Sequence, residues 1–234
     1  VVIGSAFVDI KGFPFDTYIP DGRNAGRVEY VHGGVARNVV EDIANVELRP
    51  TYIGLVDDTP LGEDVLKKLK NHKVNCDYVR KVDDGMGTWL AVFDNNGDVA
   101  GSISKRPNAL PLLDLFDEKG DEIFSNADSV VLQVDLHKDI VKKVFEYAKR
   151  YHLKMYALVS NMSIAAERRY LLKNFDCFIC NNGNLFNCNV IVIHVHNHFY
   201  FCIIHNSLAK ITHNAHILSK FFLNWNIVFF FDNV

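Results

Sequence analysis

The sequence predicts an α/β fold with a mostly parallel sheet, and two features of its residue pattern lead to this conclusion. After Leu112, apolar runs of strand length alternate with stretches of helical spacing. Strands joined through helices pair in parallel by right-handed crossovers. The part of the chain before Leu112 contains more short strands and turns, which predicts additional β structure beside the main sheet.

In the first half, the apolar runs 1–10 and 51–56 each read as one strand. Apolar residues at helical spacing predict a helix over 35–46. Pro60 opens a second helix that ends near Asn71, because proline is favoured in the first turn of a helix.

Outside these two helices, the pattern before Leu112 favours short strands. Segment 15–30 reads as strands and turns, and further strands are expected over 78–82, 87–93 and 99–104. The last two are joined by 94–98, which contains an Asn-Gly pair typical of a hairpin.

The second half alternates regularly between the two kinds of element. The expected order is a helix ending at 123–124, a strand at 129–134, a helix at 140–151, a strand at 154–159, a helix at 163–172 and a strand at 177–180. Ligands of such sheets bind beyond the carboxyl ends of the strands, so the polar residues that follow each strand are the candidate site.

Composition limits the class of protein. A chain of 234 residues can form one domain with a good core. The net charge of -3 gives no basic footprint for nucleic acid or an anionic membrane, and the apolar runs are shorter than the roughly 20 residues of a membrane span. Five cysteines without a disulfide framework, and no visible secretory signal, favour reduced thiols in the cytoplasm.

The most informative motif is Gly33-Gly34-Val35-Ala36-Arg37-Asn38. Adjacent glycines let the backbone approach a ligand closely, and an Asn one turn into the next helix offers an amide beside them. The motif is neither a P-loop nor a dinucleotide fingerprint, because it has no Gly-Lys-Ser/Thr and no Gly-x-Gly-x-x-Gly. It suits a ligand rich in hydroxyl groups.

Several motifs in one order resemble the ribokinase-like (PfkB) carbohydrate and nucleoside kinases. They are Val2–Asp9, Gly33–Val40 with Gly54 and Gly62, and Leu132–Asp135. The form Gly-Gly-Val-x-Arg-Asn is most similar to the pseudouridine kinase branch. The resemblance covers about residues 1–181 and implies a three-layer sandwich with a mostly parallel sheet and a small β lid.

The resemblance implies a division of the chain and an activity. It places a ribokinase-like domain at 1–182, with its lid at about 12–32 and 87–104, and leaves 183–234 as an atypical tail. It implies ATP-dependent phosphorylation of a sugar or nucleoside hydroxyl, with Mg²⁺ as the second cofactor. The implied partner is a small molecule rather than nucleic acid or membrane, and a homodimer would form through the lid.

The resemblance also assigns roles to residues of the acceptor site. Asp9 would accept hydrogen bonds from vicinal sugar hydroxyls, and Gly33, Gly34 and Asn38 would complete that contact. Asp135 would bind substrate or order the site, although an N-cap for the helix beginning near Lys138 is an alternative role for it.

Three further positions carry weaker expectations. Phe7 stands where ribokinases proper have a polar Asn, which favours a substrate carrying a base. Thr88 is a candidate base contact. Asn181 would order the nucleotide phosphates and their Mg²⁺ through water.

The part of the implied site that would bind the phosphate donor and carry the catalytic base has no counterpart in the sequence. The family places its catalytic Asp in a Gly-Ala-Gly-Asp run, which is absent from this chain, and Asn184 stands where the family has Glu. No catalytic residue is therefore assigned. We expect this chain alone to be an inactive, incomplete kinase, with a non-catalytic carbohydrate- or nucleoside-binding protein as the alternative.

The tail at 183–234 differs sharply in composition. It holds six of the ten histidines and eight of the seventeen phenylalanines, with no Pro, Arg or Glu. Out-of-frame or non-coding translation, a divergent gene end and a genuine alternative ending all fit this composition. His194, His196 and His198 alternate as on one face of a strand, but they have no acidic neighbours to orient them as metal ligands. No metal site is predicted, and a zinc-binding function ranks last.

Overall fold

The computed structural model describes residues 1–172, 174–180, 191–195 and 198–202. The elements in chain order are β1 (Val2–Ile3), β2 (Phe7–Pro14), β3 (Gly26–Gly33), α1 (Val35–Asn45), β4 (Tyr52–Ile53), β5 (Leu55–Asp57), α2 (Pro60–Asn71), β6 (Arg80–Val82), β7 (Gly87–Phe93), β8 (Val99–Lys105), α3 (Pro111–Ser125), β9 (Ser129–Gln133), α4 (Lys138–Arg150), β10 (Lys154–Val159), α5 (Met162–Glu167), α6 (Arg169–Leu172), β11 (Cys177–Cys180), β12 (Ile191–Val195) and β13 (His198–Cys202).

The core sheet has five strands in the order β11-β10-β9-β1-β4, and every neighbouring pair is parallel. Val2 in β1 lies opposite Val131 in β9 and Tyr52 in β4, so this two-residue strand stands between two partners. The predicted α/β fold with a mostly parallel sheet is confirmed. Since all five strands run the same way, their carboxyl ends meet at one edge of the sheet.

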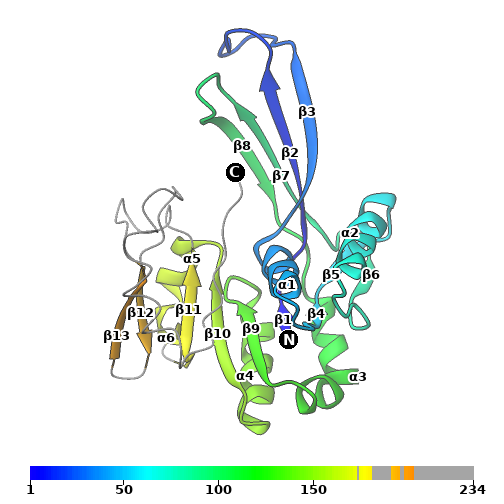
Figure 1. Cartoon of the computed structure of the whole chain (residues 1–234), viewed down its shortest axis with the longest axis vertical. Coiled ribbons are helices and arrows are strands. Elements are labelled where there is room, and N and C mark those ends of the chain that lie inside the picture. The colour runs from blue at the N-terminus through cyan, green and yellow to red at the C-terminus, as the bar shows by residue number, and fades with distance from the viewer. Residues whose placement is uncertain (173, 181–190, 196–197, 203–234) are drawn as a thin grey trace.

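Helices cover both faces of the core sheet (Figure 1). Neighbouring residues of a strand point to opposite faces, and β1 shows this directly. Val2 belongs to a buried cluster that contains residues of α1 and α2, whereas Ile3 belongs to a second cluster with residues of α3 and α4. Two separate apolar cores therefore produce the three layers.

A second sheet of four strands, the lid sheet, rises from the core as a long arm (Figure 1). Its order is β3-β2-β7-β8, with β2 and β7 parallel and the two outer pairs antiparallel. The tight turn between β7 and β8 includes Gly97 at a φ of 84°, which matches the predicted Asn-Gly hairpin. Two smaller pairs complete the described structure, β5 with β6 and β12 with β13.

Two runs predicted as single strands are each divided between sheets. Run 1–10 becomes β1 in the core sheet and β2 in the lid sheet, and run 51–56 becomes β4 and β5. A glycine marks each division. A Cβ at Gly54 would lie 2.8 Å from the carbonyl oxygen of Gly4, and the Tyr52 hydroxyl donates a hydrogen bond of 2.9 Å to that same oxygen. The backbones at Gly4 and Gly54 can approach this closely because neither residue carries a side chain.

The C-terminal third gives two further differences. The predicted helix at 163–172 is two short helices, α5 and α6. The prediction that His194, His196 and His198 share one face of a strand is wrong, because His194 lies in β12 whereas His198 lies in β13, paired with Val195. The remainder of 183–234, where the tail hypotheses apply, lies outside the described residues. None of the described helices is long and apolar enough to cross a membrane.

Candidate functional site

Asp9 and Gly33 meet at the base of the lid sheet. Asp9 in β2 lies opposite Val31 in β3, and Gly33 follows two residues later on the same face. A Cβ at Gly33 would lie 2.3 Å from Oδ1 of Asp9 and 2.7 Å from its Oδ2. The Asp9 carboxylate therefore lies directly against the Gly33 backbone.

Gly34 turns the chain from β3 into α1. Its φ of 94° belongs to the left-handed region that favours glycine, and a Cβ would lie 2.6 Å from the carbonyl oxygen of Ser5. The carbonyl oxygen of Gly34 accepts the first bond of α1 from the Asn38 amide, at 2.9 Å. The two glycines thus meet different neighbours, Gly33 the Asp9 carboxylate and Gly34 the joint between β1 and β2.

The buried guanidinium group of Arg37 forms hydrogen bonds to the backbone of this loop. Arg37 is 4% exposed, and it donates hydrogen bonds of 3.1 Å to the carbonyl oxygens of His32 and Gly33. It also contacts the amide oxygen of Asn38. That bond assigns the amide oxygen of the exposed Asn38 to Arg37, so Asn38 offers its NH₂ group as a donor to a ligand.

The charges beneath the loop are arranged around Glu41. Its carboxylate pairs with Arg37 one turn earlier and with Nζ of Lys68 in α2, at 3.1 Å. Burial alone would raise the pKa of Glu41, but the adjacent Arg37 and Lys68 hold this pKa below its ordinary value. Glu41 therefore stays ionised and balances the buried guanidinium.

The pKa of Asp9 is shifted in the opposite direction from that of Glu41. Burial raises the pKa of Asp9 above its ordinary value, although the charges of Lys11 and Arg37 act against the rise. A carboxylate that has lost part of its hydration has a stronger tendency to accept hydrogen bonds from a bound hydroxyl.

Asp135 follows β9 at the carboxyl edge of the core sheet, and its side chain is 5% exposed. Both of its carboxylate oxygens accept from the Ser160 hydroxyl at 2.8 Å, and Arg106 after β8 lies 3.7 Å from Oδ2. The N-cap of α4 is His137 and not Asp135, so the alternative role of Asp135 as an exposed helix cap is wrong.

Arg168, between α5 and α6, fixes the loop that carries Asp135. It donates hydrogen bonds to the carbonyl oxygens of Val134 and Leu136, on either side of Asp135. The backbone of the loop is therefore held by a side chain from the later connection between β10 and β11.

Thr88 is not brought to Asp9. Thr88 is paired with Val8, whereas Asp9 is paired with Trp89, so Thr88 and Asp9 lie on opposite faces of the lid sheet. Trp89 shares the face of Asp9, and its ring packs edge-on against Phe93 with centroids 6.3 Å apart. Phe7 lies on this face too, with its ring 2.2–2.5 Å from the place of a Cβ at Gly87.

The predicted site residues therefore form two groups, one around Asp9 and one around Asp135. Ser5 lies between these groups. Gly34 lies against the carbonyl of Ser5, and the amide of Ser5 donates to the side chain of Gln133, which leads to Asp135. Asn181, the residue expected to order phosphates and Mg²⁺, lies outside the described residues. Within the part of the chain that the structure describes, no cluster of three potential metal-ligating side chains is present.

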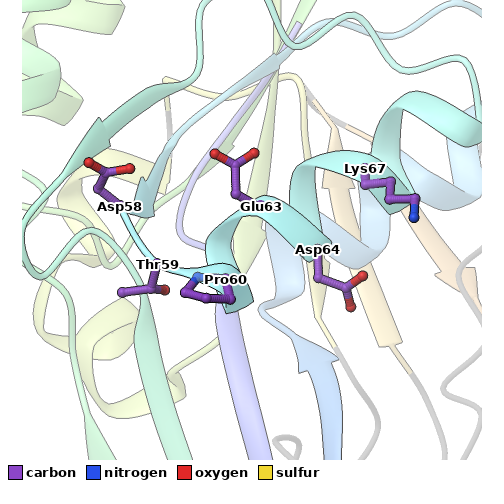
Figure 2. A pocket seen from close by; sticks show the side chains of 6 residues that line it. All are labelled: Asp58, Thr59, Pro60, Glu63, Asp64 and Lys67. Atoms are coloured by element: carbon purple, nitrogen blue, oxygen red, sulfur yellow. The ribbon is translucent and has the colours of Figure 1, made fainter.

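A shallow pocket at the N-terminus of α2 contains none of the predicted site residues (Figure 2). The carboxylates of Glu63 and Asp64 point to different sides of α2 (Figure 2). Each already has a partner, Glu63 with Lys81 and Asp64 with His32. Two of the carboxylates that line the pocket are therefore already ion-paired, and the pocket is not an extension of the Asp9 group.

Sequence reasoning missed Arg37, Gln133 and Arg168 as supports of the site. The spacing of Arg37 and Glu41, one helical turn apart, was the available signal for a buried ion pair. Gln133 and Arg168 act through contacts far along the chain, and no local pattern marks them.

The fold is that of the ribokinase-like sugar kinases. The ribokinase of Arabidopsis thaliana, solved with ribose and ATP, superposes with a TM-score of 0.62 at 18% identity, covering 93% of this chain and 67% of that one. The ribokinase of Giardia lamblia superposes with a TM-score of 0.63 at 18% identity, covering 79% and 62%.

The sequence comparisons place the chain in a family. The pfkB family of carbohydrate kinases matches residues 1–181, and the chain belongs to this family. It is 34% identical over 181 residues to guanosine-inosine kinase of Exiguobacterium acetylicum, covering 77% of this chain and 60% of that enzyme. It is 25% identical over 105 residues to pseudouridine kinase of Escherichia coli, covering 44% and 34%. The chain thus spans at most about 60% of these two relatives.

Proposed function

We propose that residues 1–182 form the acceptor-binding part of a nucleoside kinase, which phosphorylates a sugar hydroxyl of its substrate with ATP and Mg²⁺. The observation that carries the proposal is the Asp9 carboxylate lying against the Gly33 backbone, within 2.3 Å of the place of a Cβ. Because Gly33 has no side chain, the Asp9 carboxylate can accept hydrogen bonds from both hydroxyls of a vicinal diol.

The residues of this chain would act on the acceptor by binding and orientation. Asp9 accepts hydrogen bonds from ribosyl hydroxyls, and the Asn38 NH₂ group donates to a neighbouring oxygen. Arg37 fixes the loop, so the contact is formed before the ligand arrives. ATP would supply the phosphoryl group, and Asn181 is the residue we assign to its phosphates.

The aromatic face around Asp9 supports a nucleoside rather than a simple sugar. Trp89 lies beside Asp9 on the same face, and Phe7 adds a second ring nearby. A flat base attached to a ribose held by Asp9 can stack on such a surface. The names of the relatives, guanosine-inosine kinase and pseudouridine kinase, agree with this substrate class.

The opposite face of the lid sheet supports a homodimer. One row of apolar residues crosses the four strands of this face: Tyr30, Ile10, Leu90 and Ile103. All of them except Ile10 are exposed large hydrophobic residues. An apolar row of this kind favours contact with a second copy of the lid. A cytoplasmic location goes with the proposal, because ATP and nucleosides are cytoplasmic substrates.

Calorimetry on the full chain with inosine, guanosine, pseudouridine and free ribose tests the acceptor site. We expect saturable binding of at least one nucleoside, tighter than that of ribose. Absence of binding for all four compounds would overturn the proposal.

The alternative function is binding without phosphoryl transfer, and the sequence gives the specific reason to consider it. No Gly-Ala-Gly-Asp run exists anywhere in the chain, so neither a base nor an anion hole can be assigned. ATP consumption with the nucleoside that binds and with Mg²⁺ distinguishes the two functions. Turnover near ~1 s⁻¹ would establish a complete kinase, whereas background turnover with intact binding would favour the binding protein.

A further inference from the structure

Gln133, the only glutamine in the sequence, is buried at the carboxyl end of β9. Gln133 is only 5% exposed, yet both the oxygen and the nitrogen of its side-chain amide have hydrogen-bond partners. Oε1 accepts a hydrogen bond of 2.9 Å from the Ser5 amide, and Nε2 donates one of 3.2 Å to Oγ of Ser160. A backbone N–H can only donate, so the orientation of the Gln133 amide is fixed by chemistry.

The hydrogen bonds of this group run in one direction. Gln133 donates to Ser160, and the Ser160 hydroxyl donates to both oxygens of Asp135. Each donor polarises the next, which strengthens the whole chain of bonds. An apolar side chain at 133 would leave the Ser5 amide without its acceptor and would remove the donor that orients Ser160.

Ser5 lies at the joint between the core and the lid. Residues 4–6 are buried and connect β1 of the core sheet to β2, the lid strand that carries Asp9. The packing at this joint is close, since a Cβ at Gly4 would lie 2.5 Å from Oε1 of Gln133. The lid has a second connection to the same place, because Arg106 follows β8 and approaches Asp135.

We propose that Gln133 is a positioning residue, which connects the lid joint at Ser5 to the Ser160–Asp135 pair and so fixes the lid acid Asp9 relative to the core acid Asp135. Gln133 need not touch the substrate in this role. The effect on substrate rests on the proposed function above, but the effect on the joint does not.

Gln133→Met tests the proposal, because methionine has similar length and no hydrogen-bonding amide. We expect nucleoside affinity to fall by about 10-fold, and amide hydrogen exchange to rise in the peptide that covers residues 4–9. Val130→Ala is the matched control. Val130 is fully buried in the same strand, β9, but has no contact in this hydrogen-bonded group, so the control lowers the melting temperature and leaves affinity and exchange at 4–9 unchanged.

Gln133→Glu adds a readout that a purely structural role would not change. An ionised Glu accepts from Ser5 but cannot donate to Ser160, whereas a protonated Glu can do both. We expect the affinity of Gln133→Glu, taken relative to wild type at each pH, to recover as the pH falls from 8 to 5.5. A constant ratio would contradict the proposal.

The two proposals fail in different ways. If the wild type binds no nucleoside or sugar, the proposed function fails, and exchange at residues 4–9 still decides the role of Gln133. If the wild type binds but Gln133→Met behaves like Val130→Ala in both measurements, Gln133 is an ordinary buried residue and this inference is overturned.

Discussion

The carboxylate of Asp9 lies in the space that a side chain at position 33 would need, within 2.3 Å of the place of its Cβ. Gly33 is therefore required by a neighbour in another strand rather than by its own backbone angle. Gly34, the next residue, is required by both its φ of 94° and its contact with Ser5.

Replacing Gly33 by Ala should reduce nucleoside affinity by about 10-fold or more, because the new methyl group pushes Asp9 from its position. Gly101→Ala is the matched control, since a Cβ at Gly101 meets nothing within 4 Å. Calorimetry on both variants checks the difference. Equal affinities would show that Asp9 does not contact the ligand from this place.

Replacing Asp9 by Ala should weaken nucleoside binding by about 10- to 100-fold, the effect of losing charge-assisted hydrogen bonds. The exposed Asp16, near the far end of the lid, provides a control with the same chemical change. Asp16→Ala is expected to bind like the wild type, and equal affinity in the Asp9 variant would refute the assignment.

The raised pKa of Asp9 predicts a pH dependence of stability. Because the folded state holds the Asp9 proton more tightly than the unfolded state, stability falls as pH rises from the unfolded pKa through the folded pKa. Asp9→Asn removes this ionisation. Its melting temperature should exceed that of the wild type at pH 7, and the difference should shrink towards pH 3. Urea or thermal unfolding across this range measures it, and a difference that grows on acidification has the wrong sign.

Removing the buried guanidinium should be costly. Arg37→Met leaves the carbonyl oxygens of His32 and Gly33 without their donor and removes the buried partner of Glu41, so we expect a loss of about 3–5 kcal/mol in the free energy of unfolding. Lys68→Met removes the exposed partner of the same Glu41 and should cost within about 1 kcal/mol. Urea unfolding of the two variants tests this order, and a similar cost for both would contradict it.

Trp89 and Thr88 give a test of the lid face that contacts the base. Trp89→Ala should weaken nucleoside binding by about 1–3 kcal/mol, the range for a base stacked on an aromatic side chain, while ribose binding stays unchanged. Thr88→Ala lies on the other face and should leave both unchanged. If Thr88→Ala were the variant that lost nucleoside affinity, the base would lie on the opposite side of the lid.

Local patterns predicted the elements that stay within one sheet or one helix along their whole length. Strands 87–93 and 154–159 have the expected bounds, as does the helix that ends at Asn71. The runs 1–10 and 51–56 were each misassigned as one strand. An apolar run indicates burial but not the sheet in which each part is buried, and here the sheet changes within three residues at Gly4 and within one at Gly54.

The candidate site shows the same limit. The Gly-Gly motif and Asp9 stand out in the sequence, and the structure places them together. Thr88 was chosen for its position near the lid, but a one-residue step along a strand reverses its face. Gln133 and Ser160 meet only because β9 and β10 end at the same edge of the sheet.

The buried joint at residues 4–6 determines how the lid can respond to a ligand. A segment packed against Gly34, Gln133 and Tyr52 cannot rotate freely, so the lower part of the lid is a preformed wall and not a swinging cover. The entropic cost of ordering this wall falls on folding rather than on binding, which leaves more of the contact energy for affinity.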